Sequence, residues 1–359
     1  MKKTALIMAG GRGERFWPRS RKNLPKQFLS LTNDGVTMIQ HTVNRILPLV
    51  GAENIFISTN YEYVDIVKKQ LPQVPEENIL CEPVARNTAP CIALAAMHIL
   101  KKYGDALMIV LPSDHLIMHK EMFKYTLQDA CNVAEDNTNL ATIGIVPTAP
   151  ETGYGYIKFN DKRLDFNSSN AFKVDRFVEK PELDKAKDYL ASGVYLWNSG
   201  MFVWKASSII HNIQKFLPSI YDGVKNIVDA ASSENYRQIL DKEFAAFESI
   251  SIDYGVLEKA ENIFVLPGSF GWDDVGSWLA LERINKTDDC KNVVDGNVIT
   301  IDTTNSIIQA KEKLIAAVGL EDLIIVDTDD ALLVCRKSDA GKIKKVLENL
   351  RVCNRREYI

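Results

Sequence analysis

The feature that most constrains this chain is a short apolar run, Thr4–Ala9, that leads directly into a glycine-rich turn. An apolar run of this length predicts a buried strand at the start of the chain. Gly10, Gly11 and Gly13 follow the run. Such glycines let the backbone turn sharply and direct several N–H groups at one bound anion. The first residues therefore predict a strand and a turn that can hold a phosphate group.

Cationic side chains crowd behind this turn: Arg12, Arg15, Arg19, Arg21, Lys22 and Lys26. A polyphosphate is bound by backbone donors at close range with mobile cations around them. Two known phosphate motifs are excluded, because Glu14 stands where a P-loop needs lysine and Phe16 stands where a dinucleotide fingerprint needs glycine. On the glycines alone, a turn beside a solvated basic face stays an open alternative.

Strand-like runs alternate with helical patterns along much of the chain. Further strands are predicted at 54–58, 106–111 and 141–146, helices at 38–49, 89–102 and 122–135, and a largely helical stretch at 207–259. This alternation predicts an α/β fold with a Rossmann-like mixed, mostly parallel sheet and helices on both faces. Ligands bind beyond the carboxyl ends of such strands, where the glycine turn and Asp114 fall.

The pattern changes after Lys286 to short β-like runs. These runs lie at 297–301, 306–309, 314–318, 323–327 and 332–336, and a closing helix is predicted at 340–350. We therefore predict a large α/β domain at residues 1–287 and a small β-rich domain at residues 288–359. The short runs of the small domain fit the coils of a short β-helix.

Composition bounds the partners and the compartment. The 359 residues are 46% hydrophobic and carry a net charge of −4, so no overall basic field draws the chain to nucleic acid or a membrane. The six cysteines form no Cys-x-x-Cys pair, which is typical of reduced thiols in the cytoplasm. The first apolar run stops at Ala9, which is too short for an export signal or a membrane span.

Three acidic residues are candidates for binding a divalent cation: Asp114 and the adjacent Asp273 and Asp274. Mg²⁺ prefers one or two carboxylates together with phosphate oxygens and waters. Adjacent side chains of an extended segment point to opposite faces, so only one of Asp273 and Asp274 is expected to face a ligand. For Asp114, a role in a turn or a helix cap after its strand stays an open alternative.

The glycine turn and its cations resemble the signature of the sugar-nucleotide pyrophosphorylases. That signature is Gly-Gly-x-Gly-x-Arg followed by Pro, Ser and a Pro-Lys pair, here Gly10, Gly11, Gly13, Arg15, Pro18, Ser20 and Pro25-Lys26. Motifs typical of the mannose-1-phosphate guanylyltransferases follow in family order: Phe16-Trp17-Pro18, Lys26-Gln27-Phe28, Glu82-Pro83, Arg86–Pro90, Leu111–His115, Thr152–Ile157, Phe177–Pro181, Asn198–Phe202, Ser251–Tyr254 and Trp272–Gly276. The ordered series is far more specific than any one motif.

This resemblance implies an enzyme that forms GDP-mannose and pyrophosphate from GTP and mannose 1-phosphate with Mg²⁺, by in-line attack and without a covalent enzyme intermediate. It implies that Asp114 and Asp274 hold the metal, since the family pattern Trp-x-Asp-x-Gly selects Asp274. The implied catalytic residues are Arg15, Lys26 and Lys180, the last on the sugar phosphate. The implied nucleotide-binding residues are Gly10, Gly11, Arg12, Gly13, Glu82, Asn87 and Thr88, and the implied sugar-phosphate-binding residues are Gly155, Glu179 and Asn198.

Several of these roles have alternatives in the sequence. A carboxylate accepts both donors on one edge of guanine, which favours Glu82 as its reader, but Glu82 opening a loop and Thr88 capping a helix is an equal alternative. Asn198-Ser199-Gly200 is predicted to form a small polar turn.

Two other functions stay open: the same reaction with another sugar 1-phosphate or nucleotide, and a non-catalytic regulator that binds a nucleotide sugar. We also expect a cytoplasmic homodimer, and no isomerase activity because the chain ends at Ile359.

Overall fold

The structure is a computed structural model that describes residues 1–11, 13–136, 138–163 and 170–359. It contains two compact units, each assembled from several stretches of the chain. The first unit comprises Met1–Gly10, Val43–Pro112 and Ile117–Trp272, and the second comprises Gly11–Thr42, Ser113–Leu116 and Asp273–Ile359. The residues after the glycine turn therefore fold together with the C-terminal end of the chain. The domain boundary at 287/288 stays a prediction.

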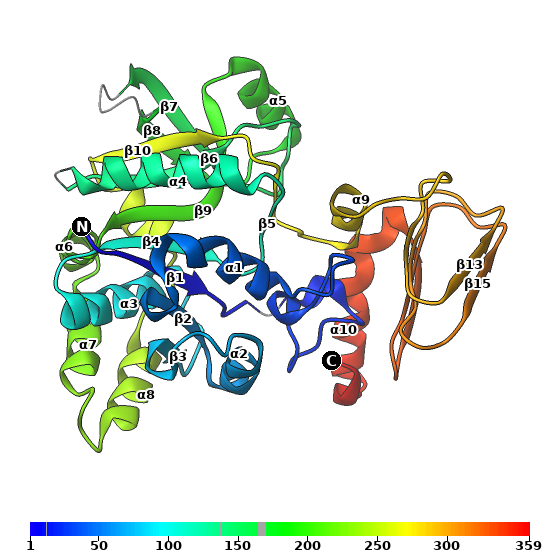
Figure 1. Cartoon of the computed structure of the whole chain (residues 1–359), viewed down its shortest axis with the longest axis horizontal. Coiled ribbons are helices and arrows are strands. Elements are labelled where there is room, and N and C mark those ends of the chain that lie inside the picture. The colour runs from blue at the N-terminus through cyan, green and yellow to red at the C-terminus, as the bar shows by residue number, and fades with distance from the viewer. Residues whose placement is uncertain (12, 137, 164–169) are drawn as a thin grey trace. The chain divides into compact units, whose positions relative to one another are not determined.

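The first unit is built around a nine-stranded mixed sheet (Figure 1). The strands, in the order β3-β2-β1-β4-β9-β6-β10-β8-β7, are β3 (Ile79–Glu82), β2 (Ile55–Asn60), β1 (Lys3–Met8), β4 (Leu107–Pro112), β9 (Tyr195–Lys205), β6 (Leu140–Ile145), β10 (Ile263–Gly268), β8 (Phe172–Val178) and β7 (Tyr156–Arg163). Strands β9 and β8 run antiparallel to their neighbours, so the remaining strands share one direction. The mostly parallel sheet expected from the sequence is confirmed.

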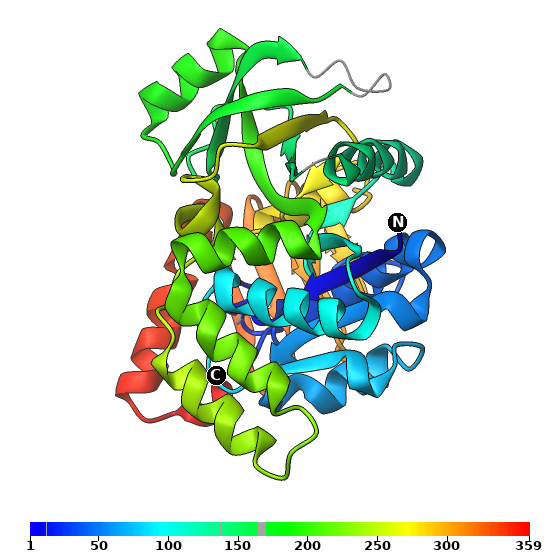
Figure 2. The same cartoon turned by 90° about the vertical axis from the view of Figure 1, so that its left-hand side faces the viewer.

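Helices bury both faces of this sheet. They are α1 (Met38–Val50), α2 (Val64–Gln70), α3 (Thr88–Tyr103), α4 (Lys120–Glu135), α5 (Leu183–Ser192), α6 (Ala206–Phe216), α7 (Pro218–Asp229) and α8 (Tyr236–Ala246). On one face α3, α6 and α7 lie side by side (Figure 2) and share a core with the strand residues Leu6 and Met108. The alternating residues Ile7 and Ile109 are also fully buried, and α4 packs against β4, β6, β9 and β10. Burial on both faces explains why these strands read as continuous apolar runs.

Strands β1 and β4 set the position of the predicted site motifs. They are parallel neighbours, with Met8 opposite Pro112. The chain therefore leaves both strands at the same edge of the sheet. The glycine turn follows one strand and Asp114 follows the other, as expected for a ligand site beyond the carboxyl ends of parallel strands.

The second unit contains a small β-helix-like region. Strands β12 (Val293–Asp295), β14 (Ile307–Gln309) and β16 (Leu323–Asp327) stack in parallel, as do β13 (Val298–Ile301) and β15 (Ile315–Val318) in Figure 1. Strand β17 (Leu332–Arg336) closes the first stack in antiparallel fashion, and β5 (Leu116–Ile117) pairs with β11 (Trp272–Asp273). Successive parallel strands on two walls are the coils that the short sequence runs predicted.

One hydrophobic core joins the two ends of the chain within the second unit. Phe16 and Trp278 are fully buried with ring centroids 5.2 Å apart, and the Trp278 indole N–H donates to the carbonyl of Trp17 at 3.1 Å. The next helices after α8 are α9 (Leu281–Ile284) and α10 (Ile343–Val352). Ile343 and Leu347 of α10 lie in the same core. The segment behind the glycine turn therefore depends on the C-terminal helix for its packing.

Two further properties hold for the whole described chain. No helix among residues 1–11, 13–136, 138–163 and 170–359 is both long and apolar enough to span a bilayer. All six cysteines are free thiols, and of these Cys290 and Cys353 are exposed.

Candidate active site

Lys26 lies at the centre of the predicted phosphate site. It begins the short helix η2 (Lys26–Phe28) and is only 5% exposed. Its Nζ donates to Oδ2 of Asp114 at 2.8 Å and to the backbone oxygen of Asp274 at 2.5 Å. A buried ammonium is costly unless it is paired, so these acceptors fix its position. Lys26 thereby joins the two acidic segments that the sequence selected.

The Asp114 carboxyl is electrostatically prepared to stay ionised. Burial alone raises its pKa, but the charge of Lys26, the nearby His115 and the hydrogen bond from Lys26 outweigh burial and hold the pKa below its ordinary value. About a third of the side chain is accessible to solvent, at 34%. Asp114 can therefore offer a negatively charged oxygen to a ligand at any pH near neutrality.

Gly13 is required by the close approach of the glycine turn to Lys26. Its φ is +56°, in the left-handed region that favours glycine. A Cβ atom built on Gly13 would lie 2.4 Å from the Cβ of Lys26 and 2.6 Å from its backbone nitrogen. No side chain fits there, so the third glycine of the motif sets the position of the central lysine.

A cavity of about 470 Å³ collects the predicted phosphate and metal residues of the second unit. Arg15, Lys26, Asp114 and Asp274 all line it. Arg15 belongs to the short helix η1 (Glu14–Phe16), is exposed, and makes a long hydrogen bond of 3.4 Å to the carbonyl of Gly276. Lys344 of α10 also lines this cavity, and nothing in the sequence indicated a role for it.

The structure distinguishes Asp273 from Asp274. Asp273 accepts from the Arg283 guanidinium at 2.6 and 3.1 Å and from the backbone N–H of Val275 at 2.7 Å. Val275 is fully buried with φ of +47°, a strained conformation for a β-branched residue. Asp273 therefore holds a strained turn, whereas the neighbouring Asp274 faces the cavity.

The donor set fits a magnesium ion that shares its ligands with a substrate. Among the residues that the structure describes, no three His, Cys, Asp or Glu side chains gather closely enough to enclose a metal. Two carboxylates, Asp114 and Asp274, do line one cavity. Mg²⁺ is commonly bound by one or two carboxylates with phosphate oxygens and waters, so an incomplete protein cage is the arrangement expected for it.

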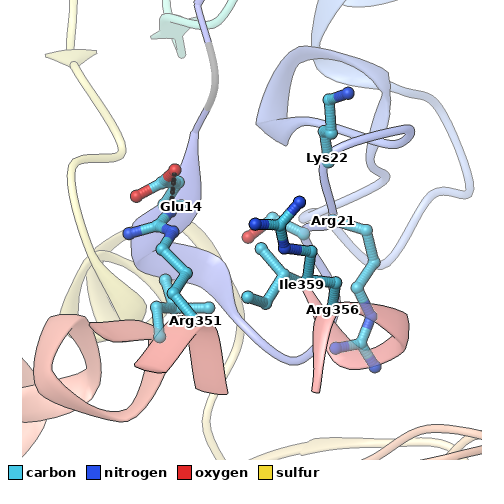
Figure 3. A pocket seen from close by; sticks show the side chains of 8 residues that line it. Glu14, Arg21, Lys22, Arg351, Arg356 and Ile359 are labelled. Carbon is cyan, nitrogen blue, oxygen red and sulfur yellow. Dashed lines mark hydrogen bonds and ion pairs between the residues drawn. The ribbon is translucent and has the colours of Figure 1, made fainter. Parts of the chain in front are cut away.

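A second cavity, of about 380 Å³, is lined by residues between Glu14 and Lys22 and by residues of α10 (Figure 3). Arg351 of α10 contributes to it and pairs with Glu14 at 2.7 Å, shown as the dashed line in the figure. Glu14 lines both this cavity and that of Lys26. Helix α10 therefore contacts the short helix that carries Arg15.

The predicted sugar-binding residues lie together in the first unit. Asn198 donates through its side-chain amide to Oδ1 of Asp253 at 2.8 Å, and its backbone N–H donates to the carbonyl of Gly155 at 2.8 Å. Tyr254 donates its hydroxyl to Oε2 of Glu179 at 2.9 Å, and Lys180 lies 3.6 Å from the other oxygen of Glu179. The side chains of Lys180 and Glu179 are 60% and 56% exposed, so both remain accessible to a ligand.

Asp253 is a member of this group that the sequence reasoning did not select. It lies in a short π-helical turn, Asp253–Leu257. Burial raises the pKa of its carboxyl against the hydrogen bond from Asn198, and the charge of Glu179 raises it further. The motif Ser251–Tyr254 was visible in the sequence, but no spacing rule connects it with Asn198.

One local prediction was wrong. Asn198-Ser199-Gly200 does not form a turn but lies inside β9, where the register against β6 shifts. Gly144 faces Asn198 and Ile143 faces Met201, so Ser199 and Gly200 form a bulge. Gly200 adopts φ of +66° there and donates its N–H to Asn198 Oδ1 at 3.1 Å. The bulge, rather than a turn, projects the Asn198 side chain toward Asp253.

The predicted base-binding residues are closely held by protein groups. Glu82 at the end of β3 is 7% exposed and accepts from Ser58 at 2.5 Å, and burial raises the pKa of its carboxyl. Asn87, with φ of +65°, caps α3 by accepting from the backbone N–H of Thr88 at 2.9 Å. The Thr88 hydroxyl accepts from the backbone N–H of Ile252 at 2.8 Å instead of capping the helix. The role of these residues in binding a base stays a prediction.

The structure thus gathers the predicted residues into groups. Arg15, Lys26, Asp114 and Asp274 share one cavity of the second unit. Gly155, Glu179, Lys180 and Asn198 belong to the first unit, as do Glu82, Asn87 and Thr88. Gly10 and Gly11 are exposed, and the carbonyl of Gly11 accepts from the Gln27 amide at 2.8 Å. Arg12 lies outside the described residues.

Comparison with known proteins identifies the family. The nucleotidyl transferase model matches residues 4–290, well over half of the chain. This chain belongs to the nucleotidyl transferase family. A second model, the MannoseP isomerase/GMP-like β-helix domain, matches residues 296–350 and confirms the β-helix expected for the C-terminal region.

Several relatives of this nucleotidyl transferase are named mannose-1-phosphate guanylyltransferase. This chain is 42% identical to the mannose-1-phosphate guanylyltransferase of Salmonella montevideo over 99% of this chain and 75% of that protein. It is 40% identical to the mannose-1-phosphate guanylyltransferase of Escherichia coli K12 over 98% of this chain and 74% of that protein. A Thermus thermophilus crystal structure described as a mannose-1-phosphate geranyltransferase matches 98% of this chain and all of that one, with a TM-score of 0.88 and 33% identity. The resemblance stated from the motifs is confirmed, and the chain is an enzyme.

Proposed function

We propose that this enzyme transfers a guanylyl group from GTP to mannose 1-phosphate, forming GDP-mannose and pyrophosphate. A phosphate oxygen of the sugar forms a bond to the α-phosphorus of GTP while the bond from that phosphorus to the α,β-bridging oxygen breaks. The observation that carries the proposal is the cavity lined by Arg15, Lys26, Asp114 and Asp274. The names of the relatives suggest the substrates.

The residues of this cavity suit a triphosphate. Arg15 and Lys26 can bind phosphate oxygens through charge-assisted hydrogen bonds, and those on the leaving pyrophosphate strengthen as its charge builds up. Asp114 and Asp274 would hold Mg²⁺ together with phosphate oxygens. When bound, the cation would neutralise charge on the phosphates and help to align them. The described residues of this cavity offer alignment and positive charge.

For mannose 1-phosphate we propose the group around Glu179 in the first unit. Lys180 supplies a cation for the sugar phosphate, while Glu179 and Asn198 supply an acceptor and an amide for hydroxyl groups. Asn198 is held by Asp253 and by Gly155, so its amide is already oriented. An oriented amide discriminates between sugars by the position of their hydroxyls.

We propose that the carboxylate of Glu82 recognises guanine, and a substitution tests this directly. Glu82→Gln should lower the preference for GTP over ATP by about tenfold if the carboxylate reads the base. If Glu82 only bonds Ser58, the melting temperature should fall while the preference is unchanged. The ratio of kcat/KM values for the two nucleotides, measured beside a thermal melt, separates these roles.

The decisive experiment measures pyrophosphate release across four nucleoside triphosphates and several sugar 1-phosphates. We expect the highest kcat/KM with GTP, mannose 1-phosphate and Mg²⁺, and a loss of at least about 10²-fold for Asp114→Asn. A different preferred pair would replace the substrates named here. Tight binding of GDP-mannose without pyrophosphate release from any pair would indicate a regulator instead. Full activity of Asp114→Asn would remove Asp114 from the metal site.

Compartment and assembly are proposed on separate grounds. Six free thiols suit a reducing compartment, so we propose the cytoplasm. We also propose a homodimer, which sedimentation tests directly: a single monomeric species across the concentration range would exclude it.

A further inference from the structure

We propose that Lys344 of α10 is an additional catalytic cation, which binds the β- and γ-phosphates of the nucleotide and stabilises the leaving pyrophosphate. This inference rests on the proposed function, since it assigns the triphosphate to the cavity of Lys26. Lys344 comes from the C-terminal region matched by the β-helix family model, whereas the other cations of that cavity come from the segment behind the glycine turn. A residue of the small β-rich region would then take part in the chemistry.

The packing of α10 fixes where Lys344 points. Ile343 and Leu347 are 3% and 2% exposed and belong to the core of the second unit. Lys344 lies next to Ile343 and seven residues before Arg351, so Lys344 and Arg351 share one side of the helix two turns apart, about 10 Å along its axis. Arg351 is paired with Glu14, as Figure 3 shows. The helix thus contacts η1, and Lys344 lines the cavity that Arg15 also lines.

The charges in the cavity explain why this extra cation matters. Lys26 is already engaged by Asp114 and by the carbonyl of Asp274. Among the described residues, Lys344 has neither a hydrogen-bond acceptor nor an ion-pair partner, and it is exposed. Glu14 is paired with Arg351, and the two carboxylates Asp114 and Asp274 equal Arg15 and Lys26 in number. Without Lys344, a polyphosphate would therefore meet carboxylate, lysine and arginine side chains with no excess of positive charge.

The chemistry places this cation on the leaving group. When the bond between the α-phosphorus and the bridging oxygen breaks, the electron pair departs with pyrophosphate and its charge increases. A lysine on a flexible stem can follow the departing group, and its effect is largest in the transition state. Binding of mannose 1-phosphate, assigned to Lys180 in the first unit, should not depend on Lys344.

The test compares Lys344→Gln with Lys345→Gln, a matched control on the same helix. Lys345 is also exposed but is not among the described residues that line the Lys26 cavity or the Arg351 cavity. For Lys344→Gln we expect kcat for pyrophosphate release to fall about ten- to a hundredfold, and KM for pyrophosphate in the reverse reaction to rise by a similar factor. KM for mannose 1-phosphate should stay within about twofold, and Lys344→Arg should restore most of the activity. Melting temperatures of all three variants should match the parent enzyme.

Calorimetric titration with inorganic pyrophosphate separates this inference from the proposed function. Weaker binding by Lys344→Gln than by Lys345→Gln would support the phosphate contact even if no nucleotide and sugar pair gave turnover. An active parent enzyme whose Lys344→Gln variant behaves like Lys345→Gln in kinetics and titration would overturn the inference while leaving the proposed function intact.

Discussion

Lys26 and Asp114 form a charge pair inside a cavity that we propose also receives phosphate. The pair is only partly shielded, since Asp114 is 34% exposed and Lys26 is 5% exposed. Lys26 keeps the pKa of Asp114 low against the effect of burial. Lys26 therefore controls the charge state of Asp114, and its removal should alter both activity and pH dependence.

Lys26→Met should lower kcat about 10²–10³-fold. It should also lower the free energy of unfolding by about 2 kcal/mol, which is less than the loss of a fully buried pair would cost, because Asp114 is partly solvated. In the parent enzyme the pKa of Asp114 is lower in the folded than in the unfolded state. The ionised carboxyl therefore stabilises the fold at pH values above the unfolded pKa, and this stabilisation is lost as the pH falls through the folded pKa. In the variant burial dominates and the pKa rises, so stability should instead decrease as pH rises through it. Melting curves between pH 2 and 8, with Asp114→Asn added to restore stability, check this sign.

Asp273 and Asp274 provide a matched pair for separating stability from catalysis. Asp274→Asn should lower pyrophosphate release at least about 10²-fold, with a smaller change in melting temperature than Asp273→Asn, because Asp274 lines the cavity. Asp273→Asn should lower unfolding free energy by about 1–3 kcal/mol, since Arg283 loses a charged partner and one of its two acceptor oxygens, which leaves the strained Val275 turn less firmly held. Thermal melts and steady-state kinetics on both variants should give opposite patterns. Equal patterns would contradict the division of roles.

At the scale of helices and strands, the contact between the glycine turn and η2 is the tightest constraint on the phosphate site. Gly13→Ala would bring a Cβ atom within 2.4 Å of Lys26 Cβ, at a positive φ. Because the clash involves the Cβ atom and the backbone nitrogen of Lys26, it can be relieved only if η2 moves. The position of the central lysine is therefore coupled to a glycine thirteen residues earlier.

Gly13→Ala should cost about 2–3 kcal/mol of unfolding free energy and lower kcat by more than tenfold, from strain and displacement of Lys26. Gly341→Ala is the control, because a Cβ there meets nothing within 4 Å and its φ is not positive. Chemical denaturation with activity measurements compares the two. A Gly13→Ala enzyme as stable as Gly341→Ala would show that the turn adjusts without moving η2.

The sequence predicts elements well where one physical signal dominates. Strands β1, β2, β4 and β6 are buried on both faces, so their apolar runs indicate them, and α3 is indicated by Pro90 near its start and by its alanines. Strand β9 was misread at Asn198, because a polar triplet with a glycine has the composition of a turn while the register shift that forms a bulge depends on β6. Lys344 lies in a predicted helix, but its place in the cavity that Lys26 lines depends on a core between residues far apart in the chain. Pairings of that kind leave no local pattern.

For the molecule as a whole, the main consequence is that the phosphate site depends on both ends of the chain. Phe16 and Trp17 share a core with Trp278, and Ile343 and Leu347 of α10 complete it. Residues 11–42 thus pack with residues 273–359 in one unit. The site motif near the N-terminus cannot be treated as a property of the first 287 residues alone.

A chain ended after residue 287 should be inactive and poorly folded, because the partners of Phe16 and Trp17 from α10 and the β-helix are missing. Leu347→Ala in the full chain is the milder variant, and should cost about 2–5 kcal/mol of unfolding free energy. Circular dichroism, denaturation and pyrophosphate release measure both. A soluble, fully active chain of residues 1–287 would contradict this dependence.

The core shared by the two chain ends also limits how enzymes of this kind can be recombined. A chimera that takes its N-terminal half from one relative and its C-terminal tail from another would pair mismatched partners around Phe16, Trp278 and Leu347. Segments 11–42, 113–116 and 273–359 should be exchanged as a set, while insertions that alter sugar choice belong in the first unit. Crossover points at 10/11, 42/43, 112/113, 116/117 and 272/273 follow the packing rather than the linear order of the motifs.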